Sequence, residues 1–259
     1  MKTTQTESLM ENSIKINIKD PIIEISNLSK SFGTQQVLRN ISLKLYNGEN
    51  LVVLGKSGSG KSVLIKCIAG LLRSDGGTIK VFDHYVTSIN VKELGEVRQK
   101  IGFLFQSGAL YDSMTVKQNL EFPLIRLKKD LNQKQRDEKI EEVLENVGLK
   151  DALHKMPSQL SGGMCKRISL ARTIIVDPKI ILYDEPTTGL DPVTSDEISL
   201  LINDIQKKYK TSSIIITHDI QCARTTADRL IMLQNGEVYA DGNIVNYERS
   251  TDSLIKSFF

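Results

Sequence analysis

Cysteine is scarce in this 259-residue chain. Its three cysteines, Cys67, Cys165 and Cys222, include no CxxC pair. An odd number of widely spaced cysteines argues against a disulfide framework and against a zinc site. We therefore expect reduced, buried thiols in a cytoplasmic protein.

Long apolar runs are also missing. The best candidate, VLIKCIAGLL at 63–72, is interrupted by Lys66, and a bilayer-spanning helix needs about 20 apolar residues. Residues 1–20, MKTTQTESLMENSIKINIKD, lack the continuous apolar core of a signal peptide. We predict a polar N-terminal tail at 1–20, no export, and membrane contact only through a partner.

Neither sign of charge dominates the chain. Its 34 Lys and Arg stand against 31 Asp and Glu, which gives a formal net charge of +3. Proteins that bind nucleic acid usually concentrate basic residues strongly. The balance therefore predicts no nucleic-acid partner.

Short apolar runs alternate with helical patterns along much of the sequence. Buried strands are predicted at IIEI (22–25), LVVL (51–54), TIKVF (78–82), IGFLF (101–105), IILY (180–183) and SIIIT (213–217). Helices are predicted at 62–72 and 194–209. RLIMLQNGEVYADG (229–242) predicts a hairpin turning at Asn235-Gly236. The alternation indicates an α/β fold with a largely parallel sheet and an antiparallel edge.

The middle of the chain differs, because no strand pattern occurs between about 107 and 159. Its charged sequence NQKQRDEKIEEVLENVGL places Ile140, Val143, Leu144 and Val147 on one helical face. We expect an inserted helical subdomain there. The last segment, 246–259, is predicted to be a short terminal helix.

GKSGSGKS, from Gly55 to Ser62, matches the phosphate-loop pattern G-x4-G-K-[ST] between a predicted strand and a predicted helix. In such loops the backbone N–H groups and the helix N-terminus face the phosphates, Lys61 would reach the β- and γ-phosphates, and Ser62 would ligate Mg²⁺. An ordinary glycine-rich turn is the competing interpretation. The predicted nucleotide-binding residues of this loop are Gly55, Ser57, Gly58, Ser59, Gly60, Lys61, Ser62 and Val63.

The strand IILY leads into Asp184, Glu185 and Pro186. Asp184 would hold Mg²⁺ through its bound water, and Glu185 would orient or deprotonate the water that attacks the γ-phosphate. A solvated acidic turn is the simpler alternative.

A second glycine loop opens LSGGMCKRISLARTII at Leu160. One nucleotide does not need two such loops from one chain, but a symmetric dimer could build each site from the first loop of one subunit and the second loop of the other. Ser161, Gly162 and Gly163 would then contact the γ-phosphate across the interface. Alternatively, Ser161 only N-caps the helix that follows.

From Ile22 to Gly242 the sequence resembles the ATP-binding cassette (ABC) ATPases. The shared motifs, in the family's order, are Phe32 in LSKSFG, the phosphate loop, Gln106 in FLFQ, LSGG, ILYDEP, TGLDP with Asp191, and ITHD with His218. The resemblance implies a P-loop NTPase domain at 21–245, with a RecA-like lobe at about 21–106 and 165–245 and a helical subdomain at about 107–164. It also implies a homodimer that encloses ATP and Mg²⁺.

The resemblance also implies roles for single residues. Phe32 would stack on adenine, Gln106 would sense the γ-phosphate and Mg²⁺ and contact a transmembrane permease, and His218 would bond the γ-phosphate and position water. Asp191 would lie at the nucleotide interface. Taken singly, these residues could instead be a core aromatic, a loop amide, a buried histidine and a helix cap.

Two details narrow the resemblance. Met164 replaces the usual Gln after LSGG, and FQSGALYDSMTV (105–116) follows the Gln106 loop. Both resemble the ATPase of the Mla type, which powers an Mce-associated phospholipid transporter, although the long C-terminal extension of its best-known members is not seen. The implied protein is a peripheral ATPase on the cytoplasmic side of the inner membrane. An ATPase for another solute, or a soluble ABC ATPase in macromolecular assembly, are the alternatives.

Overall fold

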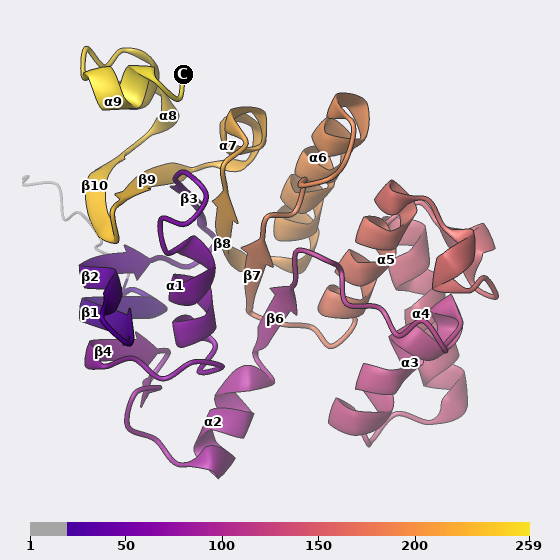
Figure 1. Cartoon of the computed structure of the whole chain (residues 1–259). Helices are drawn as coiled ribbons and strands as arrows, with labels where there is room; N and C mark the ends of the chain where they lie inside the picture. The colour runs from indigo at the N-terminus through magenta and orange to yellow at the C-terminus, as the bar shows by residue number, and fades with distance from the viewer. Residues whose placement is uncertain (1–19) are drawn as a thin grey trace, which may run out of the picture.

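The structure, a computed structural model, describes residues 20–259. The tail predicted for 1–20 lies outside the described residues except for Asp20. Within 20–259, a pair of sheets and a set of helices are arranged side by side (Figure 1).

The larger sheet has six strands in the order β10-β9-β3-β8-β7-β6. Its strands are β3 (Asn50–Leu54), β6 (Ile101–Leu104), β7 (Ile180–Asp184), β8 (Ser212–Thr217), β9 (Arg229–Gln234) and β10 (Glu237–Gly242). Pairing is parallel from β6 to β9, and β10 runs antiparallel to β9 at the edge. All residues of β3, β7 and β8 are buried, which explains their continuous apolar sequences.

The predicted hairpin joins β9 to β10. Asn235 and Gly236 have φ values of 50° and 80°, the positive region that a tight hairpin turn requires. The antiparallel edge is therefore confirmed.

A second sheet, antiparallel throughout, lies beside the first. It contains β1 (Ile23–Phe32), β2 (Gln35–Leu45), β4 (Gly76–Val81) and β5 (His84–Tyr85) in the order β2-β1-β4-β5. IIEI and TIKVF belong to this sheet and not to the parallel one, and β2 was not predicted. The second half of β2 alternates buried Ile41, Leu43 and Leu45 with exposed residues, so it contains no continuous apolar run.

Nine helices complete the described part of the chain. They are α1 (Lys61–Ile68), α2 (Val91–Arg98), α3 (Val116–Leu127), α4 (Gln133–Asn146), α5 (Gly162–Ile174), α6 (Pro192–Tyr209), α7 (Ile220–Thr226), α8 (Ile244–Glu248) and α9 (Ser253–Lys256). Short 3₁₀ turns at Lys150–Ala152 and Pro157–Gln159 connect α4 to α5. No described helix is long and apolar enough to cross a membrane.

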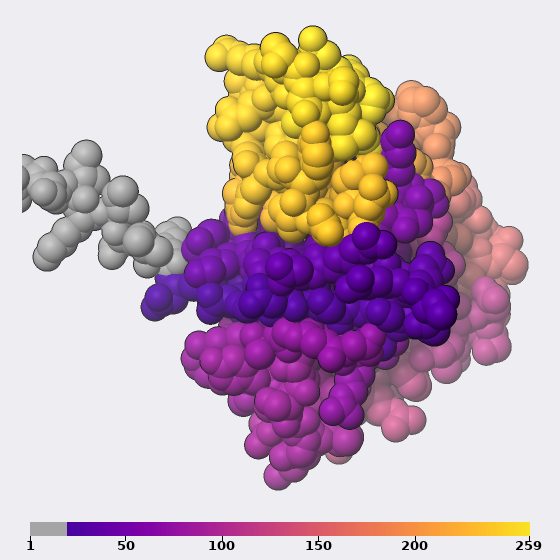
Figure 2. Space-filling view, turned by 60° about the vertical axis from the view of Figure 1, so that its left-hand side comes forward, coloured from indigo at the N-terminus to yellow at the C-terminus, as the bar shows by residue number. Residues whose placement is uncertain are grey.

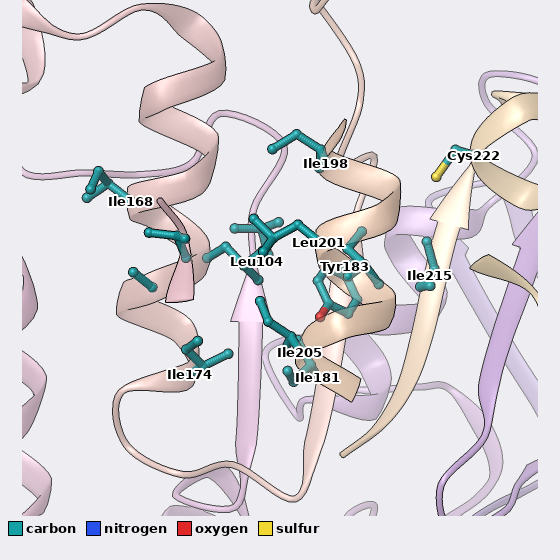
Figure 3. Packing of buried hydrophobic residues seen from close by; sticks show 14 of the residues in the cluster. Leu104, Ile168, Ile174, Ile181, Tyr183, Ile198, Leu201, Ile205, Ile215 and Cys222 are labelled. Atoms are coloured by element: carbon teal, nitrogen blue, oxygen red, sulfur yellow. The ribbon is translucent and has the colours of Figure 1, made fainter. Parts of the chain in front are cut away.

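Opposite faces of the six-stranded sheet bury different layers. Val53 and Ile214 belong to a hydrophobic cluster with α1 and the antiparallel sheet. Ile181 and Tyr183 face α5 and α6, where Ile174 and Ile205 meet them (Figure 3). Each such buried side chain stabilises the fold by about 1.5–3 kcal/mol. Because successive side chains of a strand point to opposite faces, the six-stranded sheet packs against α5 and α6 on one face and against α1 and the antiparallel sheet on the other.

The helical region between β6 and β7 contributes to the second of these clusters. Ile140, Val143, Leu144 and Val147 are buried in it, as the predicted apolar face requires. Figure 1 shows α3 and α4 on the far side of α5 from the sheet. The charged face of α4 therefore remains outside.

The C-terminal segment departs from its prediction. It forms two short helices, because Asp252 accepts hydrogen bonds from the N–H groups of Leu254 and Ile255 and starts α9 anew. The β9–β10 hairpin, by contrast, lies against the N-terminal strands (Figure 2), and the Arg39 N–H on β2 donates to the Gly236 carbonyl at 2.7 Å.

Candidate functional site

A cavity of about 390 Å³ lies where the parallel strands β3, β7 and β8 end. Ligands commonly bind at this end of a parallel sheet. The lining residues come from β2, the phosphate loop and the ends of three strands: Val37, Ser57, Gly58, Gly60, Lys61, Ser62, Val63, Gln106, Glu185 and His218. Residues predicted from four separate motifs are therefore brought together.

Gly60 makes the tight turn of the phosphate loop possible. Its φ is 102°, and a Cβ at this position would lie 2.9 Å from the Val37 carbonyl oxygen. Gly60 then starts α1, since its carbonyl accepts from the Leu64 N–H at 2.9 Å. Only glycine satisfies both the dihedral angle and the space.

The Lys61 ammonium is buried in this loop. Its Nζ donates to the Gly55 carbonyl at 2.7 Å and to the Lys56 carbonyl at 3.2 Å, and it lies 3.3 Å from Glu185 Oε1. A buried charge needs such partners. The ammonium therefore connects the loop to the end of β7.

Glu185 is held by several groups at once. Its Oε2 lies 2.8 Å from His218 Nδ1 and accepts from the Thr188 hydroxyl at 3.2 Å. Its φ is 50°, which is rare for a residue with a Cβ and costs about 1–3 kcal/mol. The surrounding bonds stabilise this strained backbone. They hold the Glu185 carboxylate toward the cavity and the His218 imidazole.

Ser62 and Asp184 form a neighbouring oxygen pair. The Ser62 hydroxyl donates to Asp184 Oδ1 at 2.9 Å. Burial raises the pKa of the Asp184 carboxyl, and the Ser62 hydrogen bond offsets part of that rise. Mg²⁺ takes oxygen ligands such as a hydroxyl and a carboxylate beside a phosphate loop, and nucleotide phosphates supply further ligands. Together with Gln106 at the cavity wall, these residues fit the predicted ion.

Phe32 is not a core aromatic. It ends β1, is 48% exposed, and has Lys30 Nζ at 5.4 Å from its ring centroid. An exposed ring of this kind is available for stacking. Phe32 does not line the cavity in the described part of the chain.

The second glycine loop and Asp191 form a separate cluster. Ser161 Oγ accepts from the Met164 N–H at 3.2 Å, and Asp191 Oδ1 accepts from the Thr194 N–H at 3.0 Å. A Cβ at Gly163 would lie 2.5 Å from Thr194 Cγ2. The start of α5 is therefore packed against the start of α6. None of these residues is among those that line the cavity in the described part of the chain.

Three features in and around the cavity were not predicted. Val37 lies on β2, which itself was missed. Thr188 bonds the Glu185 carboxylate, and the Thr187 hydroxyl donates to Asp219 at 2.9 Å, which links the loop after β7 to the loop after β8. The threonines directly follow the acidic motif, and their position was the available signal.

An apolar groove of about 500 Å³ adjoins the Gln106 loop. Phe103 and Phe105 stack at 4.2 Å between ring centroids, and Tyr111 meets Phe122 edge-on at 5.2 Å. Arg172 lies over the Tyr111 ring at 5.6 Å, and that ring is 44% exposed. The groove thus combines apolar surface with exposed aromatics.

Comparison with known proteins places these motifs in a family. The sequence profile described as "ABC transporter" matches residues 38–188. The chain belongs to the ABC transporter family. It is an ATP-binding cassette ATPase.

Three relatives differ in their named cargo. Methionine import ATP-binding protein MetN of Clostridium tetani is 38% identical over 86% of this chain and 70% of its own length. Probable ribonucleotide transport ATP-binding protein mkl of Mycobacterium tuberculosis is 43% identical over 82% of this chain and 58% of its own. Protein TRIGALACTOSYLDIACYLGLYCEROL 3, chloroplastic, of Arabidopsis thaliana is 36% identical over 93% of this chain and 74% of its own.

Solved cassettes have the same fold. The dimeric post-hydrolysis state of the ATP-binding cassette MJ0796 bound to ADP and Pi matches with a TM-score of 0.78 at 32% identity, over 86% of this chain and 98% of that one. A second dimeric MJ0796 structure, a bacterial ABC transporter cassette, has a TM-score of 0.79 at 31% identity. Both findings agree with the predicted P-loop NTPase fold.

Proposed function

We propose that this chain is the ATPase subunit of a phospholipid transporter of the Mla/Mce type, bound to the cytoplasmic side of the inner membrane through its permease. The ATPase assignment is supported by the cavity, where the Glu185 carboxylate lies within bonding distance of both Lys61 and His218. The lipid cargo is supported by resemblance in 105–116 and at Met164, and by a relative named for trigalactosyldiacylglycerol.

In the proposed chemistry ATP lies on the phosphate loop, with adenine against Phe32. Lys61 would leave its bond to Glu185 and turn to the β- and γ-phosphates, since an ammonium prefers the more highly charged partner. Ser62, Asp184 and Gln106 would hold Mg²⁺, which neutralises phosphate charge when bound.

The freed Glu185 carboxylate would orient the attacking water and accept its proton. His218 would donate a hydrogen bond to the γ-phosphate, and its contact with Glu185 sets the distance between the two groups at 2.8 Å. The left-handed backbone at Glu185 keeps the carboxylate aimed at this point before ATP arrives.

The second cluster would complete the site of a neighbouring subunit. Ser161 and Gly162 are exposed at the start of α5, and neither lines the chain's own cavity. In a homodimer these groups and Asp191 would face the partner's nucleotide, and ATP would join the two chains. The matched dimeric cassettes support this arrangement.

The groove beside Gln106 favours a transporter over a soluble assembly factor. Its exposed Tyr111 and neighbouring Phe122 offer an apolar seat for a permease helix, close to the loop that would sense the γ-phosphate. A soluble ATPase needs no such seat.

Affinity isolation of the Glu185→Gln protein from native membranes with ATP and Mg²⁺ tests the proposal. We expect a permease, an Mce-type lipid-binding subunit and enriched phospholipid, and none of these with the Lys61→Ala/Glu185→Gln control. A permease without lipid would replace the cargo by another solute. Recovery of soluble partners alone would contradict the transport function.

A further inference from the structure

Helix α5 connects the second glycine loop to the cavity residues Gln106 and Glu185 through one buried lysine. The helix begins with the second glycine loop, and one turn later Lys166 is 7% exposed and faces the chain's own cavity residues. Its Nζ donates to the backbone carbonyl of Gln106 and lies 3.4 Å from the backbone carbonyl of Glu185. One ammonium thus bridges the Gln106 loop and the end of β7.

The contacts of Lys166 do not involve the side chains of Gln106 and Glu185. Lys166 binds main-chain oxygens, so the Gln106 amide and the Glu185 carboxylate still face the cavity. The burial of Lys166 lowers its pKa, while the Asp184 and Glu185 carboxylates act in the opposite direction and favour the charged form. The two carboxylates therefore offset part of the cost of burying the ammonium.

The Gln106 loop is fixed to α5 at a second place. Arg172 donates to the Gly108 carbonyl at 3.0 Å, and a Cβ at Gly108 would lie 2.5 Å from Ser169 Oγ. The loop therefore follows α5 closely, and Lys166 is the contact that also reaches the strained Glu185.

We propose that Lys166 is a positioning residue for ATP hydrolysis, which fixes the backbone from which Gln106 and Glu185 extend within its own chain. The inference rests on the proposed roles of Gln106 and Glu185 and is independent of the transported cargo. Since Lys166 and the second glycine loop share a helix, the alternative is that Lys166 acts on the neighbour's nucleotide through that loop.

Variants of the full chain separate positioning from folding. Lys166→Met should lower kcat by about tenfold or more while changing ATP affinity less than about twofold, and Lys166→Arg should restore most of the rate. Arg167→Met is the matched control, because Arg167 bonds the Val147 carbonyl and Glu197 instead of the Gln106 loop.

Hydrogen exchange in the isolated chain provides a readout that does not depend on turnover. Exchange of the amides at 106–111 and 185–188 should rise in Lys166→Met and remain at the parental level in Arg167→Met. Parental exchange at both segments in Lys166→Met would overturn the inference.

Two mixed dimers of equal composition decide in which chain Lys166 acts. The first pairs a Lys166→Met chain with a Glu185→Gln chain, so its competent Glu185 lies beside Met. The second pairs a Lys166→Met/Glu185→Gln chain with a parental chain, so its competent Glu185 lies beside Lys166. The reference pairs a parental chain with a Glu185→Gln chain.

We expect the first dimer to hydrolyse ATP about tenfold more slowly than the reference and the second to equal it. Equal loss in both dimers, loss in the second alone, or loss in neither would overturn the inference. A reference dimer without activity would show that one Glu185→Gln site blocks turnover at the other, and the exchange measurement would then decide the role of Lys166.

Discussion

The two glycine loops of this chain lie in opposite surroundings. Around the first, Lys61 and Glu185 have side chains that are 5% and 10% exposed and bonded to each other. Around the second, Ser161 and Asp191 are exposed and cap only their own helices. A preassembled site can bind a nucleotide alone, whereas exposed N–H groups can only offer donors to something outside the chain. The difference supports sites shared between two subunits.

Glu185→Gln should have the largest effect, since it removes the proposed base from the preassembled cluster. We expect ATP hydrolysis to fall by about 100-fold or more, with ATP still bound and an ATP-dependent dimer accumulating. Phosphate release and size-exclusion chromatography measure the two effects. Parental turnover would refute the role of Glu185.

Ser161→Arg tests the exposed cluster. The added side chain would occupy the space of the neighbour's γ-phosphate, so we expect turnover to fall by about 10- to 100-fold while nucleotide binding by the monomer is retained. Nucleotide titration beside steady-state kinetics separates the two. Weaker binding by the monomer would place Ser161 in the chain's own site.

Asp184→Asn should sharpen the contrast by separating stability from function. Burial raises the pKa of Asp184, so the folded protein binds this proton more tightly than the unfolded one, and ionisation above that pKa destabilises the fold. We expect a Tm at or above the parental value at neutral pH, together with about tenfold weaker stimulation by Mg²⁺.

The same linkage predicts the effect of pH on the parent. Affinity for Mg²⁺ in the presence of nucleotide should fall as the pH falls through the raised pKa of Asp184, because the ion needs the ionised carboxylate. Calorimetric titration of Mg²⁺ at several pH values checks this prediction. For the preceding prediction, a Tm of the Asp184→Asn variant below the parental value would contradict the burial penalty assigned to Asp184.

Phe32→Ala should have the smallest effect, because the ring is exposed and outside the cavity. We expect ATP affinity to fall by about three- to tenfold with little change in kcat, the pattern of lost stacking. Tyr239→Ala, which removes a similarly exposed ring from β10, is the control. Equal affinities in the two variants would remove Phe32 from the nucleotide site.

Local motifs predicted the phosphate loop, the acid pair and the β9–β10 turn because each depends on neighbouring residues. The antiparallel sheet was assigned poorly, since the pairing of β1 with β4 depends on contacts between segments about 50 residues apart. Val37 entered the cavity through such pairing, and the Lys166 bridge depends on a separation of 60 residues to Gln106. The sequence alone had no signal for either contact.

Mixing two chains whose turnover is impaired tests the shared-site account most directly. In a dimer of Lys61→Ala with Ser161→Arg, one site combines both damaged loops and the other combines both intact loops. If each site is built from two chains, an equal mixture should regain about a quarter of the parental ATPase rate, since half of the dimers are mixed and each holds one intact site. If each chain completes its own site, the mixture will remain as inactive as its parts.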